Sequence, residues 1–130
     1  TFTSFGIFMR KTLSLAVVLC LAFGLAPAPA NAAACSVADT ESIRSLLVPI
    51  TRLSAHQGRN VDEIKEVLIE ISKITKATKS TKLRKSLKAL EGVIRDGELN
   101  PGSTYYWGYR EGSAWKTYKQ ALTLTQKNRC

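Results

Sequence analysis

The sequence has few of the residues on which most catalytic and metal sites depend. Its 130 residues include one histidine, three cysteines and one methionine. The histidine, His56, stands alone, and no cysteine has the spacing of a zinc-ligand pair. A glycine-rich phosphate loop and a Cys–His pair are also missing. We therefore expect no catalytic residues, no metal and no cofactor.

Three carboxylates are the one arrangement that could serve an enzyme. Glu63, Glu66 and Glu70 stand at positions i, i+3 and i+7 of an expected helix, so they can face one way, as a glycosidase requires. The same spacing is typical of the solvated face of an amphipathic helix, where glutamates pair with neighbouring lysines. We favour the solvated face and expect that the protein is not an enzyme.

Long apolar runs are also scarce, and the only one lies near the start of the chain. After Arg10 and Lys11, an uncharged run of 14 residues extends from Leu13 to Ala26. This run is shorter than the ~20 apolar residues that span a bilayer. Because Ala30-Asn31-Ala32 fits a cleavage site, we interpret residues 9–32 as a signal peptide. Residues 1–8 precede the only methionine and are interpreted as an upstream extension or an artefact.

An exported protein would work in the periplasm or outside the cell, and its charge then favours acidic partners. Removal of the signal peptide takes two cations and no carboxylate, so the formal net charge falls from +9 to +7. Such an excess attracts anionic lipid, polyanionic glycan or an acidic protein surface. We do not expect a nucleic acid partner, because the protein is exported and its arginine content is low. No second apolar run offers a transmembrane anchor in the mature chain.

Two cysteines remain after cleavage, and they stand close to the two ends of the mature chain. In an oxidising compartment Cys35 and Cys130 predict a disulfide. It would close a loop of about 95 residues and stabilise the fold by about 4 to 5 kcal/mol. The alternative is that Cys35 is the lipidated N-terminus of a lipoprotein. The three alanines before Cys35 lack the leucine that usually precedes such a cysteine, so we favour the disulfide.

Apolar residues recur at helical spacing through most of the mature chain. The pattern predicts an all-α fold, a small bundle of about four helices in one domain over residues 33–130. The first three expected helices span residues 40–57, 60–76 and 80–95. Pro49 predicts a kink in the first helix. Asn60 is the expected N-cap of the second helix, and Ser80 or Thr81 that of the third. Gly97 is expected to end the third helix.

The fourth segment, residues 104–127, admits two interpretations. In one, a loop runs to Gly112 and a helix follows from Ser113 to about Lys127. In the other, a single helix spans residues 104–127, with Gly108 and Gly112 forming a notch for a neighbouring helix. Each interior glycine costs about 1 kcal/mol relative to alanine. We favour the single helix, because a structureless loop of about 15 residues is uncommon in a small domain.

Aromatic side chains gather in this fourth segment. Six lie between Tyr105 and Tyr118, whereas the first three expected helices contain none. Aromatic rings with polar tips suit protein interfaces, and we expect Trp107 and Tyr109 to be exposed. The alternative is that about half of the rings, including Trp115, complete the core. The residues that we predict to bind a partner are Tyr106, Trp107, Tyr109 and Arg110.

Basic side chains gather in the third expected helix and the linker before it. No carboxylate occurs between Ser72 and Leu90, and the lysines lie away from the leucine stripe. The alternative is an ordinary solvated helix face. The residues that we predict to bind an anion, either a lipid headgroup or a glycan, are Lys79, Lys82, Arg84, Lys85 and Lys88.

These patterns together predict a small exported helical binding protein. We expect it to recognise a protein partner through its aromatic C-terminal segment, as an inhibitor, an immunity factor or an accessory subunit would. The alternative function is an envelope-surface binder of anionic lipid or glycan, which uses the lysine-rich helix. In that case the protein could be a lipoprotein anchored at Cys35.

Intact mass spectrometry of the protein recovered from expressing cells checks the compartment and the cysteine chemistry together. We expect a chain that begins at Ala33 and that alkylates at two thiols only after reduction. A chain that begins at a lipid-modified Cys35, with Cys130 free or cross-linked to another chain, would contradict both the cleavage site and the disulfide.

Overall fold

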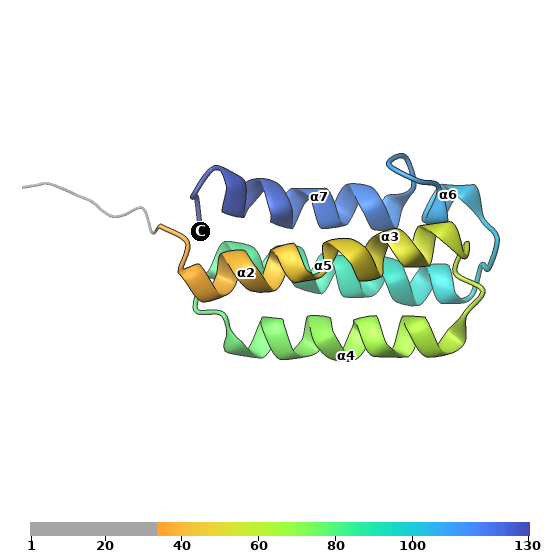
Figure 1. Cartoon of the computed structure of the whole chain (residues 1–130), viewed down its shortest axis with the longest axis horizontal. Helices are drawn as coiled ribbons and strands as arrows, with labels where there is room; N and C mark the ends of the chain where they lie inside the picture. Colours follow the sequence, from red (N-terminus) through yellow and green to blue (C-terminus); the bar gives the residue numbers. More distant parts are fainter. Residues whose placement is uncertain (1–33) are drawn as a thin grey trace, which may run out of the picture. The chain divides into compact units, whose positions relative to one another are not determined.

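The computed structural model describes residues 34–130, and these form an all-α bundle, as the sequence predicts (Figure 1). None of the helices in this range is long and apolar enough to cross a membrane. The expected signal peptide, residues 9–32, and the residues before it lie outside the described part of the chain. The helices are α2 (Val37–Ser45), α3 (Leu47–Ala55), α4 (Val61–Ala77), α5 (Thr81–Glu98), the short α6 (Thr104–Trp107) and α7 (Ser113–Gln126).

Three of the helices begin at side chains that cap their free backbone N–H groups. The Ser36 hydroxyl accepts a hydrogen bond from the backbone N–H of Asp39 (2.9 Å), so α2 starts a few residues earlier than expected. Asn60 caps α4 and Ser80 caps α5 in the same way, each through the N–H group three residues on, at 3.2 and 3.1 Å. Each cap satisfies a donor that the helix itself leaves without a partner.

The predicted kink separates α2 from α3 at Leu46. Pro49 has no N–H group, so the carbonyl of Ser45 cannot receive its usual helical hydrogen bond. The backbone forms a tighter turn there, in which the Leu46 N–H donates to the carbonyl of Ile43, three residues earlier, at 3.1 Å. Regular bonding resumes when Ile50 N–H donates to Leu46 (2.9 Å). The two helices follow one another along the bundle (Figure 1).

One core receives the apolar face of every helix. Four buried leucine and isoleucine side chains lie on α5, which packs against α4 on one side and α7 on the other. Burial of such side chains is the main favourable term in folding, at roughly 1.5 to 3 kcal/mol each. The largest fully buried side chains are aromatic, Trp107 and Tyr118.

The disulfide joins Cys35 to Cys130 at the end of the bundle where α2 begins, as predicted (Figure 1). Two hydrogen bonds fasten the same end. Cys35 N–H donates to the side-chain oxygen of Asn128 at 2.8 Å, and the Ser80 hydroxyl donates to the carbonyl of Cys130 at 2.8 Å. Because Ser80 also caps α5, the chain terminus is tied to the turn between α4 and α5.

Trp107 fastens the other end of the bundle, and the prediction that it is exposed is wrong. Its side chain is 2% exposed, and its indole N–H donates to the carbonyl of Gly97 at 3.0 Å. The ring lies between Gly58 and Gly97. A Cβ atom at these positions would approach ring atoms to 2.2 and 2.6 Å, so only glycine leaves room for it. We call this arrangement the tryptophan slot.

The slot also explains why α5 continues past its expected end. Gly97 was predicted to end the third helix, but it lies inside α5, which ends at Glu98. Its missing side chain makes room for the Trp107 ring, rather than permitting a left-handed turn. Gly58 serves both purposes, because its φ of +65° is also the conformation that glycine favours at a helix end.

The prediction of one helix over residues 104–127 is wrong as well. The chain leaves helical geometry at Gly108, makes a turn, and re-enters a helix at Ser113. A Cβ atom on Gly112 would lie 2.5 Å from the backbone nitrogen of Gly108, and Gly112 N–H donates to the carbonyl of Gly108 at 2.8 Å. The two glycines therefore let the loop fold onto itself, and they form no notch for another helix.

Two glycine-to-alanine variants test the tryptophan slot. Gly58→Ala should lower the free energy of unfolding by about 2 to 4 kcal/mol, because the new methyl group meets the Trp107 ring and the backbone has a positive φ. Gly92→Ala on α5 is the matched control, because a Cβ atom there would meet no other group within 4 Å. It should raise the free energy of unfolding by about 0.5 to 1 kcal/mol. Urea unfolding of both variants measures the difference. Equal stability of the two would contradict the slot.

Candidate functional site

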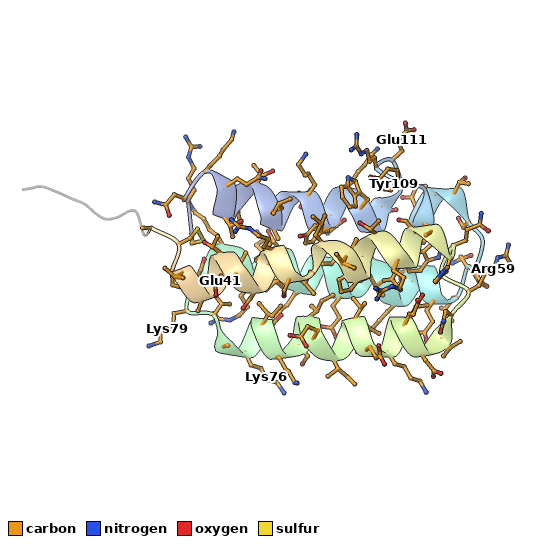
Figure 2. All side chains as sticks on the ribbon, viewed as in Figure 1. Glu41, Arg59, Lys76, Lys79, Tyr109 and Glu111 are labelled. Atoms are coloured by element: carbon orange, nitrogen blue, oxygen red, sulfur yellow. A yellow bond between two sulfur atoms is a disulfide. The ribbon has the colours of Figure 1, made fainter. Side chains whose placement is uncertain are left out.

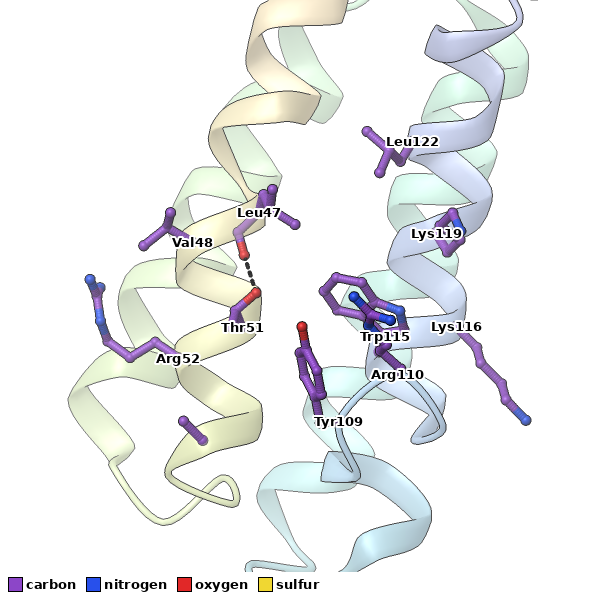
Figure 3. Close-up of a pocket in the computed structure, with 11 residues that line it drawn as sticks. Leu47, Val48, Thr51, Arg52, Tyr109, Arg110, Trp115, Lys116, Lys119 and Leu122 are labelled. Carbon is purple, nitrogen blue, oxygen red and sulfur yellow. Dashed lines mark hydrogen bonds between the residues drawn. The ribbon is translucent and has the colours of Figure 1, made fainter.

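A groove of about 1000 Å³ opens between α3 and α7 (Figure 3). One wall comes from α3, the other from α7, and the loop between α6 and α7 closes one end. We call it the α3–α7 groove. Its lining residues are Leu47, Val48, Thr51, Arg52, Ala55, Tyr109, Arg110, Trp115, Lys116, Lys119 and Leu122.

The groove begins where α3 begins, next to a contact that fastens α2 to α7. The Tyr118 hydroxyl on α7 donates a buried hydrogen bond to the carbonyl of Ile43 on α2, at 2.7 Å. The same carbonyl of Ile43 also accepts the hydrogen bond from the N–H of Leu46, the residue that separates α2 from α3. α2 is thus fastened directly to α7, and the groove begins with the first residues of α3, Leu47 and Val48.

Aromatic rings in tilted contact support the wall on the α7 side, which Tyr109 and Trp115 line. The ring centroids of Tyr109 and Trp115 lie 5.6 Å apart, and those of Trp115 and Tyr118 lie 5.9 Å apart. The guanidinium carbon of Arg110 lies 5.3 Å from the centre of the Tyr109 ring, within range of a cation–π interaction. Tyr109 is 56% exposed and stands at the mouth between the two helices (Figure 3).

Arg110 is held in a backbone conformation that is unfavourable for its residue type. Its φ of +65° is left-handed and costs roughly 1 to 2 kcal/mol for a residue with a Cβ atom. The loop around it compensates through the contact between Gly108 and Gly112 and through a hydrogen bond from the Ser113 hydroxyl to the carbonyl of Tyr105, at 2.9 Å. The turn thereby directs two consecutive side chains, those of Tyr109 and Arg110, to the groove.

The electrostatic character of the groove is positive. Four cationic side chains line it, and no aspartate or glutamate does. Within residues 34–130 the ion pairs lie elsewhere, between His56 and Glu63 (2.8 Å) and between Arg95 and Glu91 (2.9 Å). The four cations are Arg52, Arg110, Lys116 and Lys119. Arg52 also lines a second groove together with Glu63, Glu66 and Glu70, whereas the other three share no groove with a carboxylate and attract anionic groups.

Two of the four residues predicted to bind a partner lie in the groove, namely Tyr109 and Arg110. Trp107 is buried in the tryptophan slot and is not available to a partner. Tyr106 is half-buried against the core, in edge-to-face contact with Tyr105 at 4.9 Å. Tyr105, by contrast, is 72% exposed, and it also lies outside the groove.

Sequence reasoning missed the whole α3 wall of the groove. Leu47 and Val48 are apolar residues that lie off the buried stripe, at 39% and 60% exposed. That mismatch is visible in the sequence, but nothing local indicates that they face α7. Lys116 and Lys119 stand three residues apart on α7, and their place in the groove likewise depends on how the helices pack.

The residues predicted to bind an anion do not form one surface. Arg84 is half-buried and donates hydrogen bonds to the carbonyls of Thr75 and Thr78, so it caps the end of α4. With Lys76 and Lys88 it lines a small groove of about 300 Å³ between α4 and α5. Figure 2 shows Lys76 and Lys79 projecting away from the bundle. The side chains that remain exposed are Lys79, Lys82, Lys85 and Lys88.

The three carboxylates considered for an enzyme line a groove of about 370 Å³ beside Pro49 and Arg52. The Nδ1 atom of His56 lies 2.8 and 2.9 Å from the two carboxylate oxygens of Glu63, a contact across the turn between α3 and α4. Among residues 34–130, no group of three or more histidine, cysteine or acidic side chains is placed to hold a metal ion.

The α3–α7 groove is the largest of these three grooves, and it combines exposed apolar side chains with cations and has no acidic residue in its lining. Comparisons with protein-family models, with curated proteins and with solved structures found no match to the chain.

The hydrogen bond that fastens α2 to α7 should make stability depend on pH in the alkaline range. Burial raises the pKa of Tyr118 from 10.0 to about 12. Between these values the unfolded chain loses the proton and the folded protein keeps it, so the free energy of unfolding should fall as pH rises from 10 to 12. Below pH 10 the contribution is present in full.

Urea unfolding of the wild type and Tyr118→Phe across this range measures the effect. The phenylalanine variant should lose about 1 kcal/mol at neutral pH and should lack the alkaline component. The lysine titrations are common to both proteins, so the difference isolates Tyr118. Parallel pH curves for the two proteins would contradict the assignment.

Proposed function

We propose that the protein is an exported helical binding protein that recognises a protein partner through the α3–α7 groove, as an inhibitor, an immunity factor or an accessory subunit does. The observation that carries the proposal is the composition of the groove. Tyr109, Trp115 and Arg110 stand together beside exposed aliphatic side chains, and acidic residues are missing from the lining. Protein interfaces are enriched in aromatic residues and arginine and depleted of acidic ones.

The exposure of the groove walls favours a protein partner over a small ligand. Sites for small molecules enclose most of the ligand surface, and their walls are largely buried. Here Val48 is 60% exposed and Tyr109 is 56% exposed, so both walls face solvent. A partner surface could cover them and bury apolar area that is now in contact with water.

The disulfide between Cys35 and Cys130 supports the proposal that the protein is exported. Disulfides persist in oxidising compartments and are rare where thiols are kept reduced. Cys35 and Cys130 form this bond at the base of α2. A small domain that works outside the cytoplasm gains stability from such a bond without needing a larger core.

A second candidate function rests on the outer face of α5. Lys82 and Lys85 there, with Lys79 in the preceding turn, are exposed and have no acidic partner within ion-pair distance in residues 34–130. Such a face could hold the protein at an anionic lipid or glycan surface. It lacks the apolar component that the groove has, so we rank it second.

Two aspartate variants test the proposed function. Val48 and Ile69 are both β-branched, both helical and almost equally exposed, at 60% and 58%, but only Val48 lines the groove. We expect Val48→Asp to weaken capture of the partner from envelope and secreted fractions by at least about tenfold, because it places a carboxylate in the contact. Ile69→Asp should capture the partner as the wild type does. Equal capture by all three proteins would rule out the groove.

A vesicle-binding experiment distinguishes the second candidate function from the first. Binding to vesicles that contain phosphatidylglycerol should be measured with Lys85→Glu and with Val48→Asp. Salt-sensitive binding that Lys85→Glu weakens, and that Val48→Asp leaves intact, would favour the envelope-surface function.

A further inference from the structure

We infer that the α3–α7 groove receives an acidic amphipathic α-helix of the partner. This inference rests on the proposed function and adds the kind of structure that the partner presents. The apolar face of that helix packs between α3 and α7, and its acidic side chains meet the cations along α7 and at the loop end of the groove. Three features of the groove lead to this conclusion: the spacing of its apolar residues, its lack of free backbone groups and the position of its charges.

The first feature is the spacing of the apolar residues. On α3 the lining residues Leu47, Thr51 and Ala55 follow one another at intervals of four, and on α7 Trp115 and Leu122 stand seven apart. Both rows therefore extend along their helices for about two turns. Ridges of this kind accept the side chains of a third helix laid between them, with apolar residues at i, i+3 or i+4, and i+7.

The second feature is the lack of backbone hydrogen-bonding groups in the walls. An extended peptide carries unpaired N–H and C=O groups and normally binds along the edge of a sheet, where it finds partners for them. Residues 34–130 contain no strand, and both walls of the groove are helices. The Thr51 hydroxyl is also engaged, because it donates to the carbonyl of Leu47 at 2.7 Å (Figure 3). A helix satisfies its own backbone and needs only side-chain contacts.

The third feature is the placement of the cations on opposite sides. Arg52 lies on the outer side of α3, and Lys116 lies on the outer side of α7 (Figure 3). Lys119 is one turn further along α7, and Arg110 stands at the loop end of the groove. Arg52 also lines the neighbouring groove with Glu63, Glu66 and Glu70, so the cations that share no groove with a carboxylate are those on α7 and at the loop end. The complementary surface is an apolar stripe with aspartate or glutamate beside it, the usual pattern of an amphipathic helix.

A second copy of this chain is the strongest competing occupant. The outer face of α4 exposes Val61 and Ile69 together with Asp62, Glu66 and Glu70, which is similar chemistry. However, the chain carries a formal net charge of +9, or +7 without the expected signal peptide, so two copies repel one another. We therefore assign the groove to a different, acidic protein.

A peptide display library provides the test. One half of the library has apolar residues at i, i+3 or i+4, and i+7, and the other half has the same composition in strict alternation. Selection on the oxidised protein should enrich the helical half, with net negative charge. Selected synthetic peptides should gain helical circular dichroism on binding and should bind more weakly as salt rises.

Matched variants locate the binding of these peptides. Val48→Asp and Lys119→Glu should each weaken binding at least about tenfold. Ile69→Asp and Lys85→Glu, which change equivalent exposed positions outside the groove, should bind as the wild type does. Helical content and urea midpoints like those of the wild type would show that the groove variants are folded. Enrichment of alternating or uncharged sequences, no enrichment at all, or no effect of Val48→Asp would each overturn the inference.

The outcomes also separate this inference from the proposed function. If cellular capture depends on Val48 but the selected peptides are not helical, the binding function stands and the helical partner is wrong. If light scattering shows a dimer that both Val48→Asp and Ile69→Asp abolish, the occupant is a second copy. If Val48→Asp abolishes binding to vesicles that contain phosphatidylglycerol, the occupant is lipid. Each of these two results overturns the assignment to an acidic partner helix.

Discussion

The position of Trp107 between Gly58 and Gly97 is the constraint on which the functional end of the bundle depends. The indole joins the turn after α3, the last turn of α5 and the short α6 in one contact, and its N–H is satisfied by the carbonyl of Gly97. A side chain of that size allows few alternative positions once both neighbours are glycines. With Trp107 fixed, the chain has to leave α6 at Gly108 and turn back toward α7. The exposed residues of the groove are therefore positioned by a residue that no partner can touch.

The opposite end is fixed by different chemistry. There the disulfide joins the first and last described turns, and Ser80 connects the chain terminus to the turn between α4 and α5. A covalent bond between distant residues limits the unfolded chain, whereas the tryptophan slot stabilises the folded state by packing. Together they hold both ends of a bundle in which α2 and α3, with 9 residues each, are too short to be stable alone. The groove lies between these two fixed ends and can remain open without loosening the core.

The groove begins just after the junction of α2 and α3, two helices that follow one another along the bundle (Figure 1). Pro49 removes one backbone hydrogen bond there, and Tyr118 fastens α2 to α7. The first residues of α3, Leu47 and Val48, are exposed although both are apolar. Together with the cations on α7, they give the groove the mixed apolar and positive character on which the proposed function rests.

The sequence by itself determined the features that depend on neighbouring residues along the chain. Helical periodicity, the caps at Asn60 and Ser80 and the hydrogen bond that Pro49 removes are local, and the disulfide followed from the two cysteines that the expected cleavage leaves to pair. For the candidate site, the sequence indicated Tyr109 and Arg110, but it placed Trp107 on the surface and missed the wall on α3.

Only the tertiary structure decided those last points, because they depend on which helices meet. Gly58 lies far from Trp107 in the sequence and Gly97 lies ten residues from it, and nothing near either glycine indicates that an indole covers it. Periodicity shows which face of a helix is apolar, but it does not show which neighbour that face contacts. The groove is lined by residues of α3, α7 and the loop before α7, so it appears only when the chain is folded.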